Sequence, residues 1–121
     1  RHARFRNRRF IERGLLELRC AASDDLSAWP AARFDKVYAL HVVYFWHRPE
    51  RDLAEIHRVL RPGGRLVLGF CPEARSARGA EAATCQVSRV EAWLHAAGFH
   101  AIEGRCEWDA GRPLTWLWAK R

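Results

Sequence analysis

The sequence predicts an α/β domain with a mainly parallel sheet, because strand-like and helix-like segments alternate along its 121 residues. Residues 65–71 contain the run Leu-Val-Leu-Gly-Phe without polar alternation, which is typical of a strand covered on both faces of a parallel sheet. Residues 99–108 and 114–120 are strand-like and only five residues apart. So short a connection joins antiparallel strands, so the chain is expected to end in a hairpin.

The first third of the chain is expected to contain one helix and two strands. A helix is predicted over residues 4–13, with apolar side chains at Phe5 and Phe10 and a glycine stop after it. Strands are predicted over residues 15–22 and 34–41. A polar loop that contains a proline separates them.

Residues 49–60 give the clearest helix. A proline suits the first helical position, and two acidic residues follow it at the positive end of the helix dipole. Leu53, Ile56 and Leu60 recur at a spacing that puts them on one buried face. The segment Pro-Gly-Gly at 62–64 ends the helix, because proline cannot continue it and two glycines allow the positive φ of a tight reversal.

The C-terminal third is expected to hold a loop and one more helix before the hairpin. Residues 72–83 are rich in Ala, Arg, Ser and Gly, which favours a loop. In the helix that follows, Ser88 and Glu91 have the spacing of a capping box, and Gly98 ends it.

The charge of the chain leaves two interpretations open. The net charge is +7, almost all of it from arginine. Six arginines fall in the first 13 residues: Arg1, Arg4, Arg6, Arg8, Arg9 and Arg13. They form either the solvated face of an amphipathic helix or a surface that binds the phosphates of a nucleic acid.

Other features of the composition exclude several classes of protein. Four widely spaced cysteines and six histidines without ligand spacing predict no metal site. No apolar run approaches the roughly 20 residues of a membrane span, and none follows the charged N-terminus as in a secretory leader. We therefore expect a cytoplasmic protein with no membrane partner. The chain lacks methionine and opens with arginine, so a preceding segment is expected to be missing.

Three motifs carry a resemblance to a known family. Residues 34–37 (Phe-Asp-Lys-Val) resemble the start of its fourth strand. Residues 60–68 (Leu-Arg-Pro-Gly-Gly-Arg-Leu-Val-Leu) resemble its turn from a helix into the fifth strand, and residues 90–99 its last helix and the entry to its sixth strand. The family is that of the class I S-adenosylmethionine (SAM)-dependent methyltransferases, in its small-molecule "type 11" subgroup.

The resemblance implies a Rossmann-like doubly wound sheet of strand order 3-2-1-4-5-7-6, N-terminally truncated so that strands one and two are missing. The expected organisation is one partial domain over residues 1–121, with an Arg-rich helix at 1–14, strands three to five at 15–71, a variable loop at 72–84, and the last helix and terminal hairpin at 85–121. Strand three would lie about 14 Å from strand four, from roughly 4.8 Å per strand step. One edge of strand four would be unpaired and prone to association.

The resemblance also implies site residues, because ligands bind at the carboxyl ends of such strands. Ala22, Ser23 and Asp24 follow strand three, where the family holds the adenine of SAM; Ala22 stands where the family usually has an acid. His41 and Val42 end strand four and are expected beside the methionine end of SAM. Three aromatic residues follow, and they either wall the substrate pocket or pack the next helix: Tyr44, Phe45 and Trp46.

Three hypotheses about function remain open. The first is SAM-dependent methyl transfer to a small molecule, with no residue assigned as catalytic acid or base. The second is a non-catalytic fragment or interaction module, because the Gly-rich cofactor loop and the ribose-binding acid of the family are absent. The third is an RNA methyltransferase or RNA-binding domain that uses the Arg-rich helix.

Overall fold

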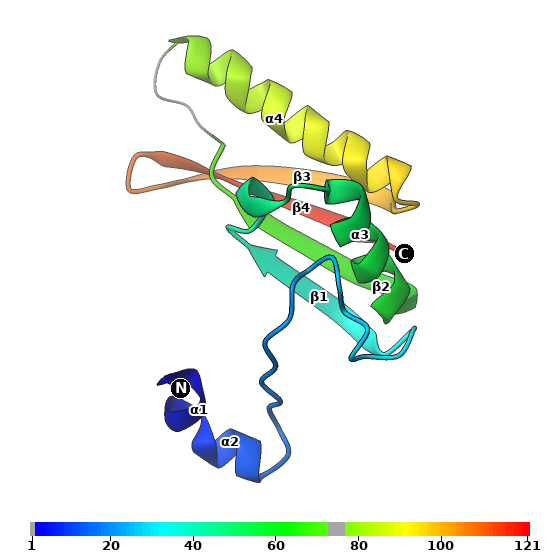
Figure 1. Cartoon of the computed structure of the whole chain (residues 1–121). Helices are drawn as coiled ribbons and strands as arrows, with labels where there is room; N and C mark the ends of the chain where they lie inside the picture. Colours follow the sequence, from blue (N-terminus) through cyan, green and yellow to red (C-terminus); the bar gives the residue numbers. More distant parts are fainter. Residues whose placement is uncertain (1, 73–76) are drawn as a thin grey trace.

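The computed structural model describes residues 2–72 and 77–121, with only the backbone path for residues 77–85 and Asp109. Its elements are the helices α1 (His2–Arg6), α2 (Arg8–Glu12), α3 (Pro49–Val59) and α4 (Ala77–Ala96), the 3₁₀ turn η1 (Val43–Phe45), and the strands β1 (Phe34–Leu40), β2 (Leu60–Phe70), β3 (His100–Asp109) and β4 (Arg112–Lys120). The strands form one sheet of order β1-β2-β4-β3 (Figure 1).

The sheet confirms the predicted mixture of parallel and antiparallel pairing. β1 and β2 are parallel, whereas β4 is antiparallel to both β2 and β3. This order equals strands 4-5-7-6 of the expected Rossmann-like sheet. The hairpin is tighter than predicted, since only Ala110 and Gly111 lie between the strands. Both have positive φ, of 47° and 75°, as in the two-residue turns that match strand twist.

The hydrophobic core lies between the sheet and the two long helices. Figure 1 shows α3 and α4 on the same face of the sheet. Side chains from this face and from the helices are completely or almost completely buried: Leu53, Ile56, Leu66, Leu68, Phe70, Val90, Leu94 and Leu117. Burial of such aliphatic side chains contributes about 1.5–3 kcal/mol each, so this layer carries most of the stability.

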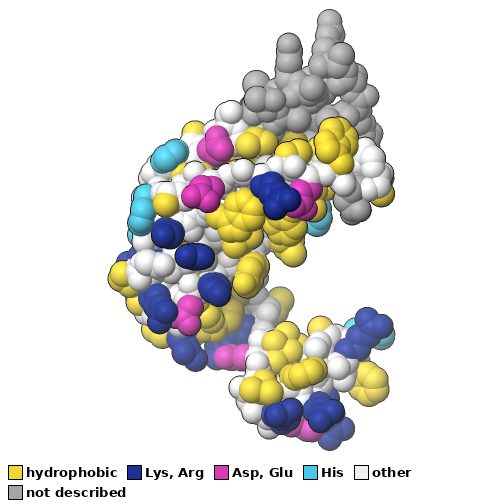
Figure 2. Space-filling view, turned by 180° about the vertical axis from the view of Figure 1, so that it is seen from behind, with side chains coloured by type: hydrophobic (Ala, Val, Ile, Leu, Met, Phe, Trp, Pro, Cys, Tyr) yellow, Lys and Arg dark blue, Asp and Glu magenta, His cyan; other side chains and the backbone are white. Residues whose placement is uncertain are grey.

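The opposite face of the sheet is open among the described residues. Successive side chains of a strand point to opposite faces of the sheet. The side chains that alternate with the buried ones therefore lie on this open face. Tyr38 is 66% exposed and Leu40 is 51% exposed. Figure 2 shows apolar side chains on the molecule seen from behind, and open space between the sheet and the N-terminal helices. No described strand pairs with the outer edge of β1, as expected if strand one has no counterpart here.

Gly63 and Gly64, in the turn at the start of β2, are required for different reasons. α3 ends at Val59, one residue before its predicted end. Gly63 has φ +74° with open space around it, whereas Gly64 lies against the backbone. A Cβ on Gly64 would stand 2.8 Å from the carbonyl oxygen of Arg61 and 3.2 Å from that of Asp35. Only Gly63 needs the positive φ; Gly64 is required because two chain segments touch there.

The predicted strand over residues 15–22 is wrong. This segment has no helix or strand in the structure, because a strand exists only when a neighbour accepts its backbone hydrogen bonds. The predicted helix over residues 4–13 is interrupted at Asn7, which separates α1 from α2. The side-chain amide of Asn7 donates to the carbonyl of Ala3 at 2.9 Å, the local competition that makes asparagine a poor interior helix residue.

The loop predicted over residues 72–83 is also partly wrong. Residues 73–76 lie outside the described residues, but α4 begins at Ala77. The Ala-rich sequence favours helix by propensity, and this outweighs its polar, loop-like composition. Ser88 and Glu91 therefore lie in the interior of α4 and form no capping box at its start.

Candidate functional site

The carboxyl ends of β1 and β2 lie side by side and form the candidate site edge. Leu40 is paired in register with Gly69. The next backbone N–H, that of His41, donates to the carbonyl of Gly69 at 2.7 Å. His41 has φ 53° and an exposed side chain. A non-glycine residue in this region costs free energy, and such residues cluster at functional sites. The imidazole lies just beyond the carboxyl end of β1, the place where ligands bind in open α/β sheets.

Tyr44 connects the two strand ends. Its hydroxyl donates to the carbonyl of Cys71 at 3.0 Å and accepts the backbone N–H of the same residue. Partial burial raises the pKa of Tyr44 above its usual value, so the hydroxyl keeps the proton that it donates. The His41 ring stacks on the Tyr44 ring, with centroids 6.4 Å apart and planes at 18°. Tyr44 thus stacks on the imidazole and links the segments that follow β1 and β2.

The other two aromatic residues divide between surface and core. Phe45 is 73% exposed, whereas Trp46 is 9% exposed and belongs to the core cluster. The indole N–H of Trp46 has no hydrogen-bond acceptor among the described residues. Val42 is half-buried and packs against the same core. Of the two predicted roles, packing the following helix therefore fits Trp46, and lining a pocket stays a prediction for Phe45.

The loop after residues 15–22 is bound to the amino end of α3. Ser23 donates its hydroxyl to the carboxylate of Asp52, which is only 4% exposed. Asp24 accepts a hydrogen bond from the Arg48 guanidinium at 3.3 Å. The carbonyl of Ala22 accepts the backbone N–H of Asp25 at 3.1 Å in a turn. The structure thus brings the predicted adenine loop to the segment that leads from β1 into α3.

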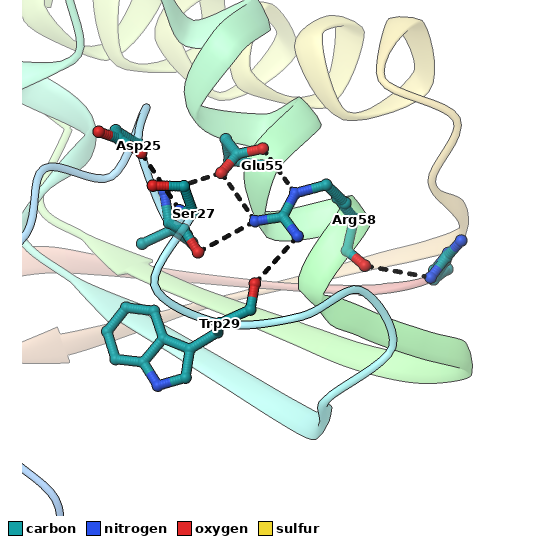
Figure 3. A network of polar contacts seen from close by, with 7 residues as sticks. Asp25, Ser27, Trp29, Glu55 and Arg58 are labelled. Carbon is teal, nitrogen blue, oxygen red and sulfur yellow. Dashed lines mark hydrogen bonds and ion pairs between the residues drawn. The ribbon is translucent and has the colours of Figure 1, made fainter.

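Further along α3, Glu55 and Arg58 form a bidentate ion pair (Figure 3). Arg58 donates from Nε to Oε1 of Glu55 at 2.7 Å and from Nη2 to Oε2 at 3.0 Å. Sequence reasoning did not identify this pair or the partners Arg48 and Asp52. The sequence did contain a signal for this pair: Glu55 and Arg58 have opposite charges and are three residues apart, which places their side chains on one face of a helix.

The ion pair predicts an acid-dependent loss of stability. The hydrogen bond from Arg58, and then that from the backbone of Leu26, lower the pKa of Glu55 below its usual 4.5. Because the folded-state pKa is the lower one, the stabilisation is present above the usual pKa of 4.5 and is lost as the pH falls through the folded-state pKa. Thermal unfolding followed between about pH 6 and about pH 3 should show the parent losing more of its melting temperature than Glu55→Gln. Equal losses in the two chains would contradict this.

The exposed imidazole of His41 and the backbone of Val42 lie at the carboxyl end of β1, and the loop of residues 22–24 is bound beside the amino end of α3. That these residues hold the methionine and adenine ends of SAM stays a prediction. No described residue supplies the Gly-rich loop or the ribose-binding acid. The described residues also contain no group of three or more metal-ligating side chains. Within the part of the chain that the structure describes, no helix has the length and apolar character needed to cross a membrane.

Comparison with known proteins identifies the family of the chain. The family described as a methyltransferase domain, of type 11, matches residues 2–68, more than half of the chain. A tRNA U34 carboxymethyltransferase of Syntrophotalea carbinolica is 34% identical over 102 residues, with 69% of this chain and 31% of the relative covered. The chain thus spans less than a third of the length of this curated relative.

Two solved structures show the likeness of fold. A SAM-dependent methyltransferase of Thermotoga maritima superimposes with a TM-score of 0.68 at 17% identity, covering 94% of this chain and 68% of the other. A phosphoethanolamine N-methyltransferase of Haemonchus contortus, solved with S-adenosylhomocysteine, gives 0.58 at 12% identity, covering 77% and 35%. The mixed α/β sheet, its strand order and the family match agree. The chain therefore belongs to the type 11 methyltransferase-domain family, whose cofactor is SAM.

Proposed function

We propose that the chain supplies the C-terminal part of an enzyme that transfers the methyl group of SAM to a small molecule. The observation that carries the proposal is the open carboxyl edge of β1, where His41 leaves the sheet with a positive φ. In this fold the ligand enters at that edge. SAM supplies a methyl group on a sulfonium, which a substrate nucleophile attacks in line.

The described residues contribute positioning rather than acid–base chemistry. Tyr44 holds the ends of β1 and β2 together, and the buried Trp46 keeps the start of the next segment in the core. His41 and Val42 border the path of the methyl group. Positioning of two reactants can account for about 7–11 kcal/mol of a barrier, so no general base is required from this part of the enzyme.

We expect the 121-residue chain alone to bind SAM more weakly than about 1 mM, because only one side of the site is present. Calorimetric titration with SAM tests this directly. The matched measurement uses a completed enzyme, in which this chain follows strands one and two of a family member, assayed for transfer of a labelled methyl group. Micromolar binding by the isolated chain would contradict the expectation. A completed enzyme that neither binds SAM nor transfers methyl would favour the non-catalytic module.

An RNA acceptor is the second candidate function, favoured by the tRNA-modifying relative and by the exposed arginines of α1 and α2. Not all of these arginines are free. Arg8 pairs with Glu12 at 2.6 Å, and Arg4 donates to the carbonyl of Leu18 at 3.1 Å. Such local contacts fit a solvated helix face as well as an RNA surface.

Replacing Arg4, Arg6, Arg8 and Arg9 with glutamine separates the two acceptors. For a small-molecule enzyme we expect methyl transfer by the completed enzyme to stay unchanged, because these side chains face solvent. For an RNA enzyme the change should weaken binding to tRNA and flatten its salt dependence by about one unit of slope per lost phosphate contact. Fluorescence anisotropy with labelled tRNA at several salt concentrations gives the answer.

A further inference from the structure

We infer that Glu55 and Arg58 are positioning residues, which hold the loop of residues 24–29 on α3 and thereby present residues 22–24 at the cofactor edge. The inference rests on the proposed function, since it concerns the same SAM site. It adds two residues that lie outside the predicted site.

The ion pair is hydrogen-bonded to the backbone of the loop. Arg58 donates from Nη2 to the carbonyl of Leu26 and from Nη1 to the carbonyl of Trp29, both at 3.0 Å. Glu55 accepts the backbone N–H of Leu26 at 2.8 Å. Figure 3 shows the guanidinium lying between the Glu55 carboxylate and the loop. Because main-chain atoms are bound, the clamp fixes the path of the loop whatever its side chains are.

The loop has little else to hold it. Its own backbone bonds are turns, such as the Trp29 N–H to the carbonyl of Leu26 at 2.9 Å. Leu26 packs against the core, and the Trp29 ring meets Phe34 edge-on with centroids 5.9 Å apart. The segment before the loop, residues 15–22, pairs with no described strand. The Asp24–Arg48 ion pair adds one more contact, but none of these contacts ties the main chain of Leu26 or Trp29 to α3.

The clamp belongs to a polar stripe that runs along α3. Asp52, Glu55 and Arg58 follow one another at steps of three residues, which puts them on one face of the helix, and Arg48 is the residue just before its first turn. Arg48 and Asp52 bind Asp24 and Ser23, and Glu55 and Arg58 bind the main chain of Leu26 and Trp29. The stripe thus aligns the loop with the helix from end to end.

The chain beyond the loop is anchored separately. The backbone N–H of Ala32 donates to the carbonyl of Arg58 at 2.9 Å, and that of Arg33 to the carbonyl of Val59 at 2.8 Å. A change in the Arg58 side chain leaves these backbone bonds in place. It should therefore loosen the loop of residues 24–29, whose remaining links to the α3 segment are the contacts of Ser23 with Asp52 and of Asp24 with Arg48, while β1 and His41 keep their positions.

The test compares Arg58→Gln with Arg51→Gln in the 121-residue chain. Arg51 is exposed on the same helix and borders the same hollow as the loop, but its side chain takes part in none of the hydrogen bonds that bind the loop to Glu55 and Arg58. Amide resonances are followed during titration with millimolar SAM, and hydrogen exchange of the Leu26 amide reports the clamp. In the parent and in Arg51→Gln we expect SAM to shift the amides of residues 22–24 and of Val42. In Arg58→Gln the Leu26 amide should exchange faster and the shifts at 22–24 should become smaller, while the shift at Val42 stays.

Each other outcome has a distinct meaning. If Arg58→Gln speeds exchange at Leu26 but leaves the shifts at 22–24 intact, the pair only stabilises the fold and the inference is overturned. If the parent chain shows no shift at either place while its Leu26 amide is protected, the same comparison is made in the completed enzyme; no shift there means that the proposed SAM site fails and that the positioning role fails with it. Partial recovery of the shifts in Arg58→Lys, which keeps the charge but not the fork of donors, would support the inference further.

Discussion

Replacing Gly64 with alanine is expected to destabilise the chain by about 1–3 kcal/mol, the usual cost of forcing atoms into a packed site. The added Cβ would stand 2.8 Å from the carbonyl oxygen of Arg61 and 3.0 Å from a methyl carbon of Leu60. The first contact is backbone and the second belongs to a completely buried side chain. Neither can move without shifting the start of β2. Chemical denaturation followed by circular dichroism measures the change in the free energy of unfolding.

The neighbouring glycine supplies the matched control. Gly63 has φ +74° and no heavy atom within 4 Å of an added Cβ. Asparagine adopts this left-handed conformation more readily than other non-glycine side chains, so Gly63→Asn should destabilise the chain less than Gly64→Ala. If Gly64→Ala proved as stable as Gly63→Asn, the close approach of the two chain segments at this turn would be wrong.

The parts of the fold that could be predicted are those whose signal is local. The apolar spacing of Leu53 and Ile56 gives α3, and the uninterrupted apolar run gives β2. The closing hairpin follows from a connection too short for a crossover. In each case a few consecutive residues contain the whole physical reason, so a single sequence is enough.

The failures concern segments whose structure depends on partners far away in the chain. Residues 15–22 have strand-like composition, but a strand also requires a neighbouring backbone, which composition cannot supply. The start of α4 is a different case, because its signal is local. Polar and small residues are typical of a loop, but their summed helix propensity favours a helix, and the structure has the helix.

The candidate site shows the same division. Its place at the carboxyl ends of the strands follows from topology, and the sequence could indicate His41 and Ser23. The partners could not be foreseen, because Ser23 meets Asp52 from 29 residues away and Tyr44 meets Cys71 from 27 residues away. Such pairs are set by how α3 packs on the sheet. The structure thereby gives roles to two of the three aromatic residues: Tyr44 binds the backbone of Cys71, and Trp46 packs in the core.

In a completed enzyme, His41→Ala is expected to raise the SAM dissociation constant or to lower the turnover rate about tenfold, equivalent to about 1.4 kcal/mol. The imidazole is exposed, it stands at the carboxyl end of β1, and its ring rests on Tyr44. Removing it takes away the proposed contact with the cofactor, and also the ring that stacks on Tyr44. The backbone bond from residue 41 to Gly69 does not depend on the side chain.

Two measurements distinguish a cofactor contact from a packing role. The dissociation constant and the rate report on the site, and the melting temperature reports on the fold, where the loss should stay within the typical 0.5–3 kcal/mol of a point mutant. Alanine at position 41 also has to adopt the positive φ, so His41→Asn, which tolerates that conformation, serves as the control for backbone strain. If His41→Asn keeps the stability of the parent and still loses about tenfold in binding or rate, the imidazole itself acts on the cofactor. Unchanged binding and turnover with only a lower melting temperature would show that His41 packs against Tyr44 and that the cofactor lies elsewhere along the edge.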